Sequence, residues 1–372
     1  MVPAAAKLPF HFGFWPSGPL DAITDVAGVR VGHLTLIQGS DIRTGATAIL
    51  PNADPWVHKM SAASLSFNGN GEMTGTHWID ESGYLEEPIV LTSTLDVGRA
   101  YDGVVDWVIE RHPEVGVTDD VPLPVVAECD DQLLSDIQKR AVTADDVRKL
   151  LDDAQPGQFA RGSVGAGTGM KAFGFKAGIG SASRVLPASM GGYTVGVLVN
   201  DNTGSSRQAL TIVGVPVGEK LRNEYKPVYP QHLGEADLHG RMQSGSIIIV
   251  VATDAPLDSR QLYAVLKRAA LGMARTGLTS DTGSGDLFVA FSTSIVFERT
   301  GNFDVAAPTK QFTENDRTIN ALYSATAEAT QAAIYDALFE AKTMTGRGGA
   351  TMYGLPVDRV LDMLRSAGAI SQ

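Results

Sequence analysis

Several short segments of the chain carry apolar side chains in strand-like patterns. In residues 28–37 they alternate with polar or small residues, as expected for a strand with one buried face. Short apolar runs at 46–50, 88–91, 123–127, 195–199 and 287–291 also predict strands. The run 247–252 is apolar throughout, directly after Gly245 and Ser246, and predicts a strand that is buried on both faces.

Helical periodicity is clearest in residues 315–342, where apolar side chains recur at i, i+3, i+4 and i+7. Helices are also predicted after Thr94, after Thr143 and over 259–275 and 357–364. Residues 218–245 are polar and rich in turn formers, which indicates a long exposed loop that leads to Ser246. Strands and helices do not alternate strictly, so we expect one α+β domain over 1–372 with stacked layers.

Composition narrows the class of protein. The chain has 372 residues, 44% hydrophobic and 19% charged, with a mean hydropathy of +0.01, which indicates a compact globular protein. The net charge is −12 and no basic cluster occurs, which argues against nucleic acid or an anionic membrane as partner. No apolar run approaches the ~18–20 residues needed to span a bilayer. The N-terminus is a poor secretory signal, so we expect a cytoplasmic protein, or a periplasmic one whose signal has been removed.

The cysteine and histidine residues do not indicate a disulfide or a metal site. Cys129 is the single cysteine, which excludes an internal disulfide and any multi-cysteine metal site. The seven histidines show no ligand spacing. We therefore expect neither a metal nor a cofactor.

The dipeptide Gly245–Ser246 at the head of the apolar run is typical of a self-cleaving hydrolase. Cleavage between the two residues would give Ser246 a free α-amine, whose ordinary pKa of about 7.7–8.0 suits a general base. Ser246 would then supply both nucleophile and base. Glycine at 245 would leave room for a neighbouring hydroxyl to reach its carbonyl. The alternative is a turn glycine before an ordinary core strand.

Other catalytic signatures are incomplete or absent. The glycine-rich stretch 165–170 lacks the third glycine of a dinucleotide-binding loop, where Met170 stands, and is better explained by close packing of backbone. Neither a G-x-S-x-G elbow nor a serine three residues before a lysine occurs. A serine enzyme of this sequence would therefore need another base, and an N-terminal amine is one.

Four further residues are candidates for the site. Ser284 and Asp286, set between glycines, are expected on an exposed turn with their side chains on the same side, where they could hold an ammonium and a hydroxyl. Asn202 ends a predicted strand and could donate to an oxyanion. Glu128 also ends a strand and could bind a substrate ammonium. Polar turns and solvent-facing acids are the alternatives.

Taken together, these segments resemble the L-aminopeptidase/D-esterase and β-peptidyl aminopeptidase family of self-processing serine hydrolases. The resemblance extends over most of the chain, through residues 21–33, 43–51, 164–184 and 214–218 and the Gly245–Ser246 dipeptide with its strand.

The resemblance implies a four-layer αββα sandwich similar to that of N-terminal-nucleophile hydrolases, with different connectivity. It implies cleavage into an α fragment, 1–245, and a β fragment, 246–372, that stay associated, often as tetramers of αβ units. By the same resemblance Ser246 is the nucleophile, Ser284 and Asp286 form the Ser-Gly-acid motif and Asn202 is the oxyanion residue. Glu128 would bind the substrate amine. Some members place a tyrosine where this chain has Asp130, which leaves that role unassigned.

The predicted function is a cofactor-free aminopeptidase that removes N-terminal residues, including β- or D-residues, from short peptides, amides or esters. Two alternatives stay open from the sequence. The same acyl-enzyme could pass its acyl group to an amine as an acyltransferase, or an uncut chain could bind amino acids or peptides without catalysis.

Overall fold

The computed structural model describes residues 7–204, 206–229, 245–299, 312–313 and 316–371. Its larger sheet has six strands in the order β4-β3-β12-β11-β10-β9. β11 and β12 are parallel, and the other neighbours in this sheet are antiparallel. The strands are β3 (His58–Gly69), β4 (Tyr84–Leu85), β9 (Ile179–Val185), β10 (Thr194–Asn202), β11 (Ser246–Thr253) and β12 (Gly285–Glu298).

The second sheet has four strands in the order β1-β2-β5-β6, of which β5 and β6 are parallel. Its strands are β1 (Arg30–Gln38), β2 (Ile42–Leu50), β5 (Ile89–Ser93) and β6 (Val125–Cys129). Two short hairpins complete the described strands, β7 (Lys171–Ala172) with β8 (Phe175–Lys176) and β13 (Met344–Thr345) with β14 (Thr351–Met352).

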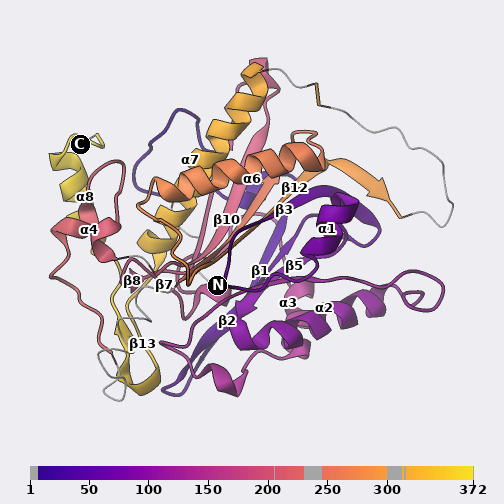
Figure 1. Cartoon of the computed structure of the whole chain (residues 1–372), viewed down its shortest axis with the longest axis horizontal. Coiled ribbons are helices and arrows are strands. Elements are labelled where there is room, and N and C mark those ends of the chain that lie inside the picture. The colour runs from indigo at the N-terminus through magenta and orange to yellow at the C-terminus, as the bar shows by residue number, and fades with distance from the viewer. Residues whose placement is uncertain (1–6, 205, 230–244, 300–311, 314–315, 372) are drawn as a thin grey trace.

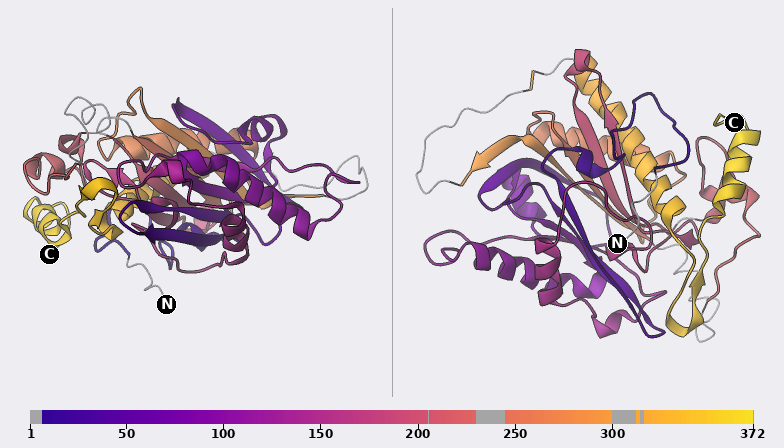
Figure 2. Two further views of the ribbon diagram at one scale, coloured as in Figure 1. Left: turned by 90° about the horizontal axis from the view of Figure 1, so that it is seen from below. Right: turned by 180° about the vertical axis from the view of Figure 1, so that it is seen from behind.

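Helices cover the outer face of each sheet (Figures 1 and 2). α6 (Ser259–Ala274) and α7 (Asp316–Glu340) pack on the six-stranded sheet, and α2 (Val97–Arg111) and α3 (Ala144–Asp152) pack on the four-stranded one. The remaining α-helices of the described residues are α1 (Thr76–Ser82), α4 (Val217–Lys220) and α8 (Val357–Ser366). This arrangement confirms the predicted αββα sandwich.

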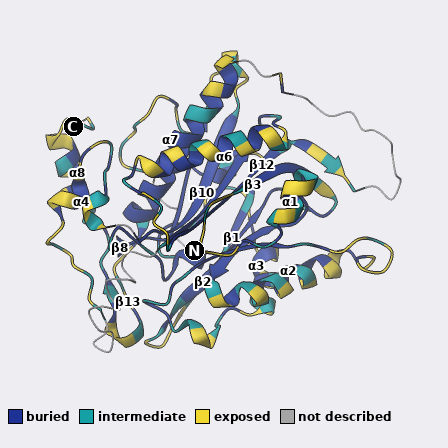
Figure 3. Ribbon diagram, in the orientation of Figure 1, coloured by how far each residue is buried: buried dark blue, intermediate teal, exposed yellow. Residues whose placement is uncertain are grey.

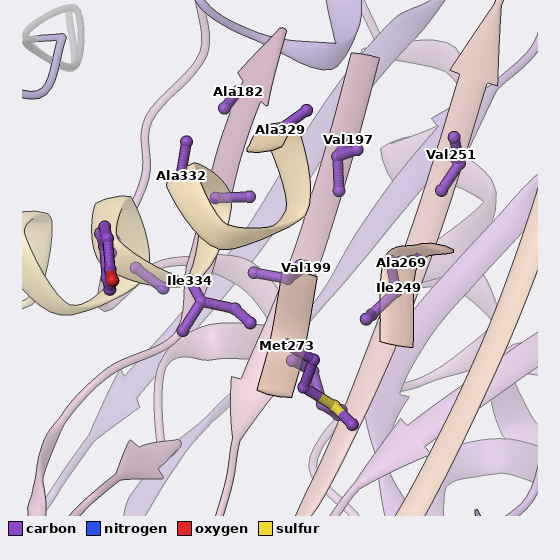
Figure 4. Close-up of a cluster of buried hydrophobic side chains, with 14 of the residues drawn as sticks. Ala182, Val197, Val199, Ile249, Val251, Ala269, Met273, Ala329, Ala332 and Ile334 are labelled. Atoms are coloured by element: carbon purple, nitrogen blue, oxygen red, sulfur yellow. The ribbon is translucent and has the colours of Figure 1, made fainter. Parts of the chain in front are cut away.

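Three hydrophobic clusters hold the layers together. One lies between α6, α7 and the large sheet, where Val197 and Ile249 meet Ala269 and Ala332 (Figure 4). The second fills the space between the sheets, and the third lies under α2 and α3. Ile247, Ile249 and Val251 belong to the first cluster, whereas Ile248 and Val250 belong to the second. β11 is therefore buried on both faces, as its uniform hydrophobicity predicts.

Most predicted elements are found. The helix after Thr143 begins with the threonine side chain accepting a hydrogen bond from the Asp146 N–H, as its sequence indicates. α7 differs from a simple amphipathic helix because it is buried on nearly all sides between β9, β10 and α6 (Figure 3). In the predicted 218–245 loop, α4 occupies the start, and residues 230–244 lie outside the described residues.

The glycine-rich stretch after Gly162 packs in the core, as predicted. A Cβ at Gly180 would overlap the carbonyl oxygen of Ala333 in α7, so only glycine lets the helix approach β9 this closely. Lys176 is fully buried nearby, and its ammonium donates to the carbonyls of Gly167 and Ala177 at 3.1 and 2.6 Å. The glycines of this region are therefore explained by close packing of backbone.

Candidate active site

Ser246 is the first residue of β11, in the interior of the large sheet between β10 and β12. It is only 6% exposed. Because side chains alternate along a strand, Ser246 shares the face of Ile248 and Val250, which look into the space between the sheets. The candidate nucleophile is thus the buried first residue of a central strand.

Gly245 lies where another backbone segment passes very close. A Cβ at this position would overlap the backbone nitrogen of Gly204 and crowd the carbonyl carbon of Thr203. The carbonyl oxygen of Gly245 accepts the Gly285 N–H at 3.2 Å. Glycine is therefore required for space, and the carbonyl that precedes Ser246 is already polarised by a donor.

Asn202 ends β10 directly opposite Ser246. Its Nδ2 donates to the Ser246 Oγ at 3.3 Å and to the Asp130 carbonyl at 2.9 Å. Its Oδ1 accepts the Lys171 N–H at 3.2 Å. These bonds fix the orientation of the amide and place a hydrogen-bond donor beside the reacting hydroxyl.

Ser284 and Asp286 lie on the other face of the sheet from the Ser246 hydroxyl. Ser284 Oγ donates to Asp286 Oδ1 at 2.6 Å, and the Ser280 hydroxyl donates to Oδ2. The prediction that they share one side is confirmed, but the prediction that they are exposed is wrong, because they are 6% and 1% exposed. Burial raises the pKa of Asp286 to about 6. In register Ser246 pairs with Gly285, so the two side chains flank the backbone of Ser246 and not its hydroxyl.

Glu128 is near the end of β6 and is 6% exposed. Its Oε1 accepts the Glu72 N–H at 3.1 Å, and Thr94 donates its hydroxyl to Oε2. Burial raises the pKa of the carboxyl above its ordinary value. Glu128 is therefore held in place by these two donors instead of facing solvent. Next along the chain, the Cys129 thiol is fully buried and donates to the Asn200 carbonyl at 3.6 Å.

These groups meet at a cavity of about 390 Å³. It brings together four of the predicted residues, Gly245, Ser246, Asn202 and Glu128, whereas Ser284 and Asp286 lie beside it. The full lining is Asn70, Gly71, Glu72, Thr94, Glu128, Asp130, Gln132, Leu133, Lys171, Asn202, Tyr229, Gly245, Ser246 and Gly283. The acids outnumber the single lysine in this lining, so the cavity favours a cationic ligand.

Sequence reasoning missed Thr94, Lys171 and Tyr229 as lining residues. In the sequence Thr94 only precedes a predicted helix, and Lys171 only follows the glycine-rich stretch 165–170. Tyr229 lies in the segment predicted as loop, where nothing local indicates contact with Ser246. Their place in the cavity lining depends on the tertiary fold, which the local sequence does not encode.

Within the described residues, no group of three or more His, Cys, Asp or Glu side chains is arranged to hold a metal ion. In the same part of the chain, no helix has the length and apolar character to cross a membrane.

An αββα sandwich with a buried serine at the head of a central strand defines a serine hydrolase of the N-terminal-nucleophile type. The model of peptidase family S58 matches residues 21–352. The chain therefore belongs to peptidase family S58, and it is a serine aminopeptidase. Membership of a peptidase family sets aside the non-catalytic alternative.

Individual relatives agree with this assignment. The β-peptidyl aminopeptidase BapA of Sphingosinicella xenopeptidilytica is 39% identical over 98% of this chain and 91% of its own. The solved β-aminopeptidase of a Burkholderia species has a TM-score of 0.86 at 40% identity, covering 96% of this chain and 97% of its own. The L-aminopeptidase D-Ala-esterase/amidase of Ochrobactrum anthropi has a TM-score of 0.85 at 37% identity, covering 97% and 98%. Its structure is described as a variant of the Ntn hydrolase fold.

Proposed function

We propose that the chain cleaves itself between Gly245 and Ser246 and that the freed α-amine of Ser246 is the catalytic base. The observation that carries this proposal is the position of Ser246, buried at the head of β11 with the Asn202 amide 3.3 Å from its hydroxyl. In the uncut chain Ser246 Oγ attacks the Gly245 carbonyl carbon, and the C–N bond breaks as the nitrogen takes a proton. Water then hydrolyses the resulting ester and leaves a free amine.

In the cut enzyme the α-amine takes the proton of Ser246 Oγ, which attacks the substrate carbonyl. Asn202 donates to the oxyanion, and Ser284 and Asp286 hold the amine from the helix-covered face of the sheet. The leaving amine departs with a proton, and water releases the acyl group from Ser246. Catalysis by this route uses only side chains and backbone of the chain.

Glu128 is proposed to bind the α- or β-ammonium of the substrate. Its carboxylate lines the same cavity as Ser246 and is held by Glu72 and Thr94. An ammonium bound there restricts cleavage to a free N-terminus. The substrates are then short peptides, amides or esters, with β- or D-residues accepted at the N-terminus as the names of the relatives suggest.

The two fragments are proposed to stay together as an αβ unit that assembles into tetramers. β11 and β12 of the second fragment lie between β3 and β10 of the first, joined by strand hydrogen bonds on both sides. The tetramer rests on the family resemblance.

Replacing Ser246 with alanine tests the assignment. The variant is expected to give one denatured mass, that of the full chain, and to have no peptidase activity, because nucleophile and base are lost together. The matched control is Ser189→Ala, an exposed serine near the opposite end of β10, which should be cut and active. A Ser246→Ala protein that is cut at 245 or still hydrolyses substrate would disprove the proposal.

A further inference from the structure

Asp201 is a buried carboxyl beside the nucleophile to which the proposed reaction gives no task. It is 0% exposed, and its Oδ1 accepts the Thr203 N–H at 3.2 Å. Its Oδ2 has no hydrogen-bond partner among the described residues. Burial raises its pKa to about 7, and the nearby charge of Asp286 adds to the rise. An unsatisfied carboxyl oxygen in the interior is unfavourable, so this oxygen is open to a further hydrogen-bond donor.

The register of the sheet places this carboxyl next to the nucleophile. Asp201 on β10 lies opposite Ile247, and Ile247 lies opposite Asp286 on β12. Asp201 and Asp286 are thus on either side of the residue that follows Ser246. Both belong to the face that α6 and α7 cover, the face of Val199 and Phe288. Two acids therefore flank the start of β11 on one side of the sheet.

The orientation of the Gly245–Ser246 peptide shows which strand a new amine would face. Its carbonyl oxygen accepts the Gly285 N–H at 3.2 Å and therefore points toward β12. The described peptide bonds are trans, and in a planar trans peptide the N–H points away from the carbonyl. The nitrogen of Ser246 therefore directs its hydrogen toward β10, the strand of Asp201.

We propose that Asp201 is a positioning residue that binds the α-ammonium of Ser246 after cleavage. The inference rests on the proposed function, because only cleavage turns the neutral amide nitrogen into a cation. Cleavage then supplies a second cation, directly at the start of β11 and between the two acids. A carboxylate held against the ammonium favours its charged form, so Asp201 helps to set the pH at which Ser246 becomes active.

Several other groups affect the carboxyls of Asp201 and Asp286. Lys171 of β7 lowers the pKa of Asp201, and Asp281 in the turn before β12 raises that of Asp286. Cys129 of β6 is buried nearby, and α6 presents Met273 to the small pocket beside Asp286. Any pH effect of Asp201 must therefore be measured against these groups, which a single substitution at 201 leaves in place.

The variant Asp201→Asn tests the inference, because asparagine keeps an Oδ1 for the Thr203 N–H and removes the charge. We expect it to be cut normally, because no ammonium exists before cleavage. In the cut variant the acid limb of the kcat/KM profile should move to lower pH by about one unit, since the ammonium has lost a stabilising anion. The probe is the p-nitroanilide of alanine or β-alanine, whichever the wild type hydrolyses.

Glu87→Gln is the matched control. Glu87 is also a buried carboxyl, and burial raises its pKa to about 7. It lies just before the start of β5 and accepts the Leu123 N–H at 2.9 Å. Its replacement should leave the acid limb in place. If Asp201→Asn does not fold, the smaller Asp201→Ser is expected to give the same shift.

A cut Asp201→Asn or Asp201→Ser enzyme with the wild-type acid limb contradicts the inference and gives Asp201 a merely structural role. An uncut variant contradicts it as well, because Asp201 would then be needed before the amine exists. A wild-type chain that stays whole would instead overturn the proposed function itself.

Discussion

At the residue scale, the Glu128 carboxylate combines a fixed position with a raised pKa. The Glu72 N–H and the Thr94 hydroxyl hold its two oxygens, and burial disfavours its charged form. A substrate ammonium bound beside Glu128 would stabilise the charged form of its carboxyl. Protonation of Glu128 is therefore expected at a higher pH than for an exposed glutamate, and it removes the attraction for the substrate amine.

Glu128→Gln should lower kcat/KM for substrates with a free N-terminus by about 10- to 100-fold, because a charged hydrogen bond is worth about 1.5–3 kcal/mol. The rise of KM that the wild type shows as the pH falls through the raised pKa of Glu128 should disappear in the variant. Steady-state kinetics across pH measure both effects.

Glu72→Gln is the control for this experiment, because Glu72 lines the same cavity but its side chain is exposed. Its effect should stay under about threefold, as for a solvent-screened charge. Equal losses in the two variants would mean that Glu128 does not bind the ammonium.

At the element scale, β11 shows what local sequence can reveal. Its uniform run of apolar residues predicts a strand buried on both faces, and Ser246 at its head is an unusual place for a hydroxyl. β3, in contrast, was not predicted. Its sequence, HKMSAASLSFNG, is rich in small and polar residues and lacks a clear alternation, although β12 and β4 enclose it.

The candidate site is predictable only in part, because local sequence does not give the order of the strands in a sheet. Asn202, Ser246 and Glu128 each stand at the end of a strand and could be named by motif. The role of Asp201 could not, because its proximity to Ser246 and Asp286 requires that β10, β11 and β12 be neighbours. The burial of Ser284 and Asp286 likewise follows from the packing of α6 over the sheet, whereas their flanking glycines indicate an exposed turn.

The β1–β2 pair carries a pH-sensitive contact. Desolvation lowers the pKa of His33 from 6.5 to about 4, and its Nδ1 lies 2.9 Å from the Thr47 hydroxyl on β2. The fold thus favours the neutral ring, so the stability that it contributes is present above pH 6.5 and is lost as the pH falls toward 4. The free energy of unfolding is expected to fall by about 2–3 kcal/mol over this pH range.

Ser246→Ala is expected to stay in one piece. Its free energy of unfolding, measured with denaturant, should therefore fall more between pH 7 and pH 4.5 than that of the double variant with His33→Asn. The difference between the two proteins isolates the histidine from other titrating groups. The same loss in both proteins would show that His33 is free to protonate in the fold.

At the scale of the whole molecule, the predicted cut falls in the middle of the large sheet. The fragment 246–372 supplies β11 and β12, and the fragment 1–245 supplies β3 and β10 on either side of them. The two hydrophobic clusters on the faces of this sheet also contain residues of both fragments. Separating the fragments would expose these clusters and break two strand pairings.

The cut protein should therefore elute from a sizing column as one species at neutral pH, although a denaturing gel resolves two fragments. Dilution should not change this result, because the fragments share one core and not a reversible surface contact. Recovery of either fragment alone without denaturant would contradict the prediction.

The insertion of β11 and β12 between strands of the other fragment has a consequence for how activity is to be measured. Ser246 meets the Gly245 carbonyl, Asn202 and Gly285 in this geometry only when the sheet has been assembled. The proposed self-cleavage would then record, irreversibly, that a molecule has folded. A substitution far from the cavity that hinders folding would lower the specific activity of a preparation while each cut molecule keeps normal kinetics. The fraction of cut chains would then report the yield of folding directly.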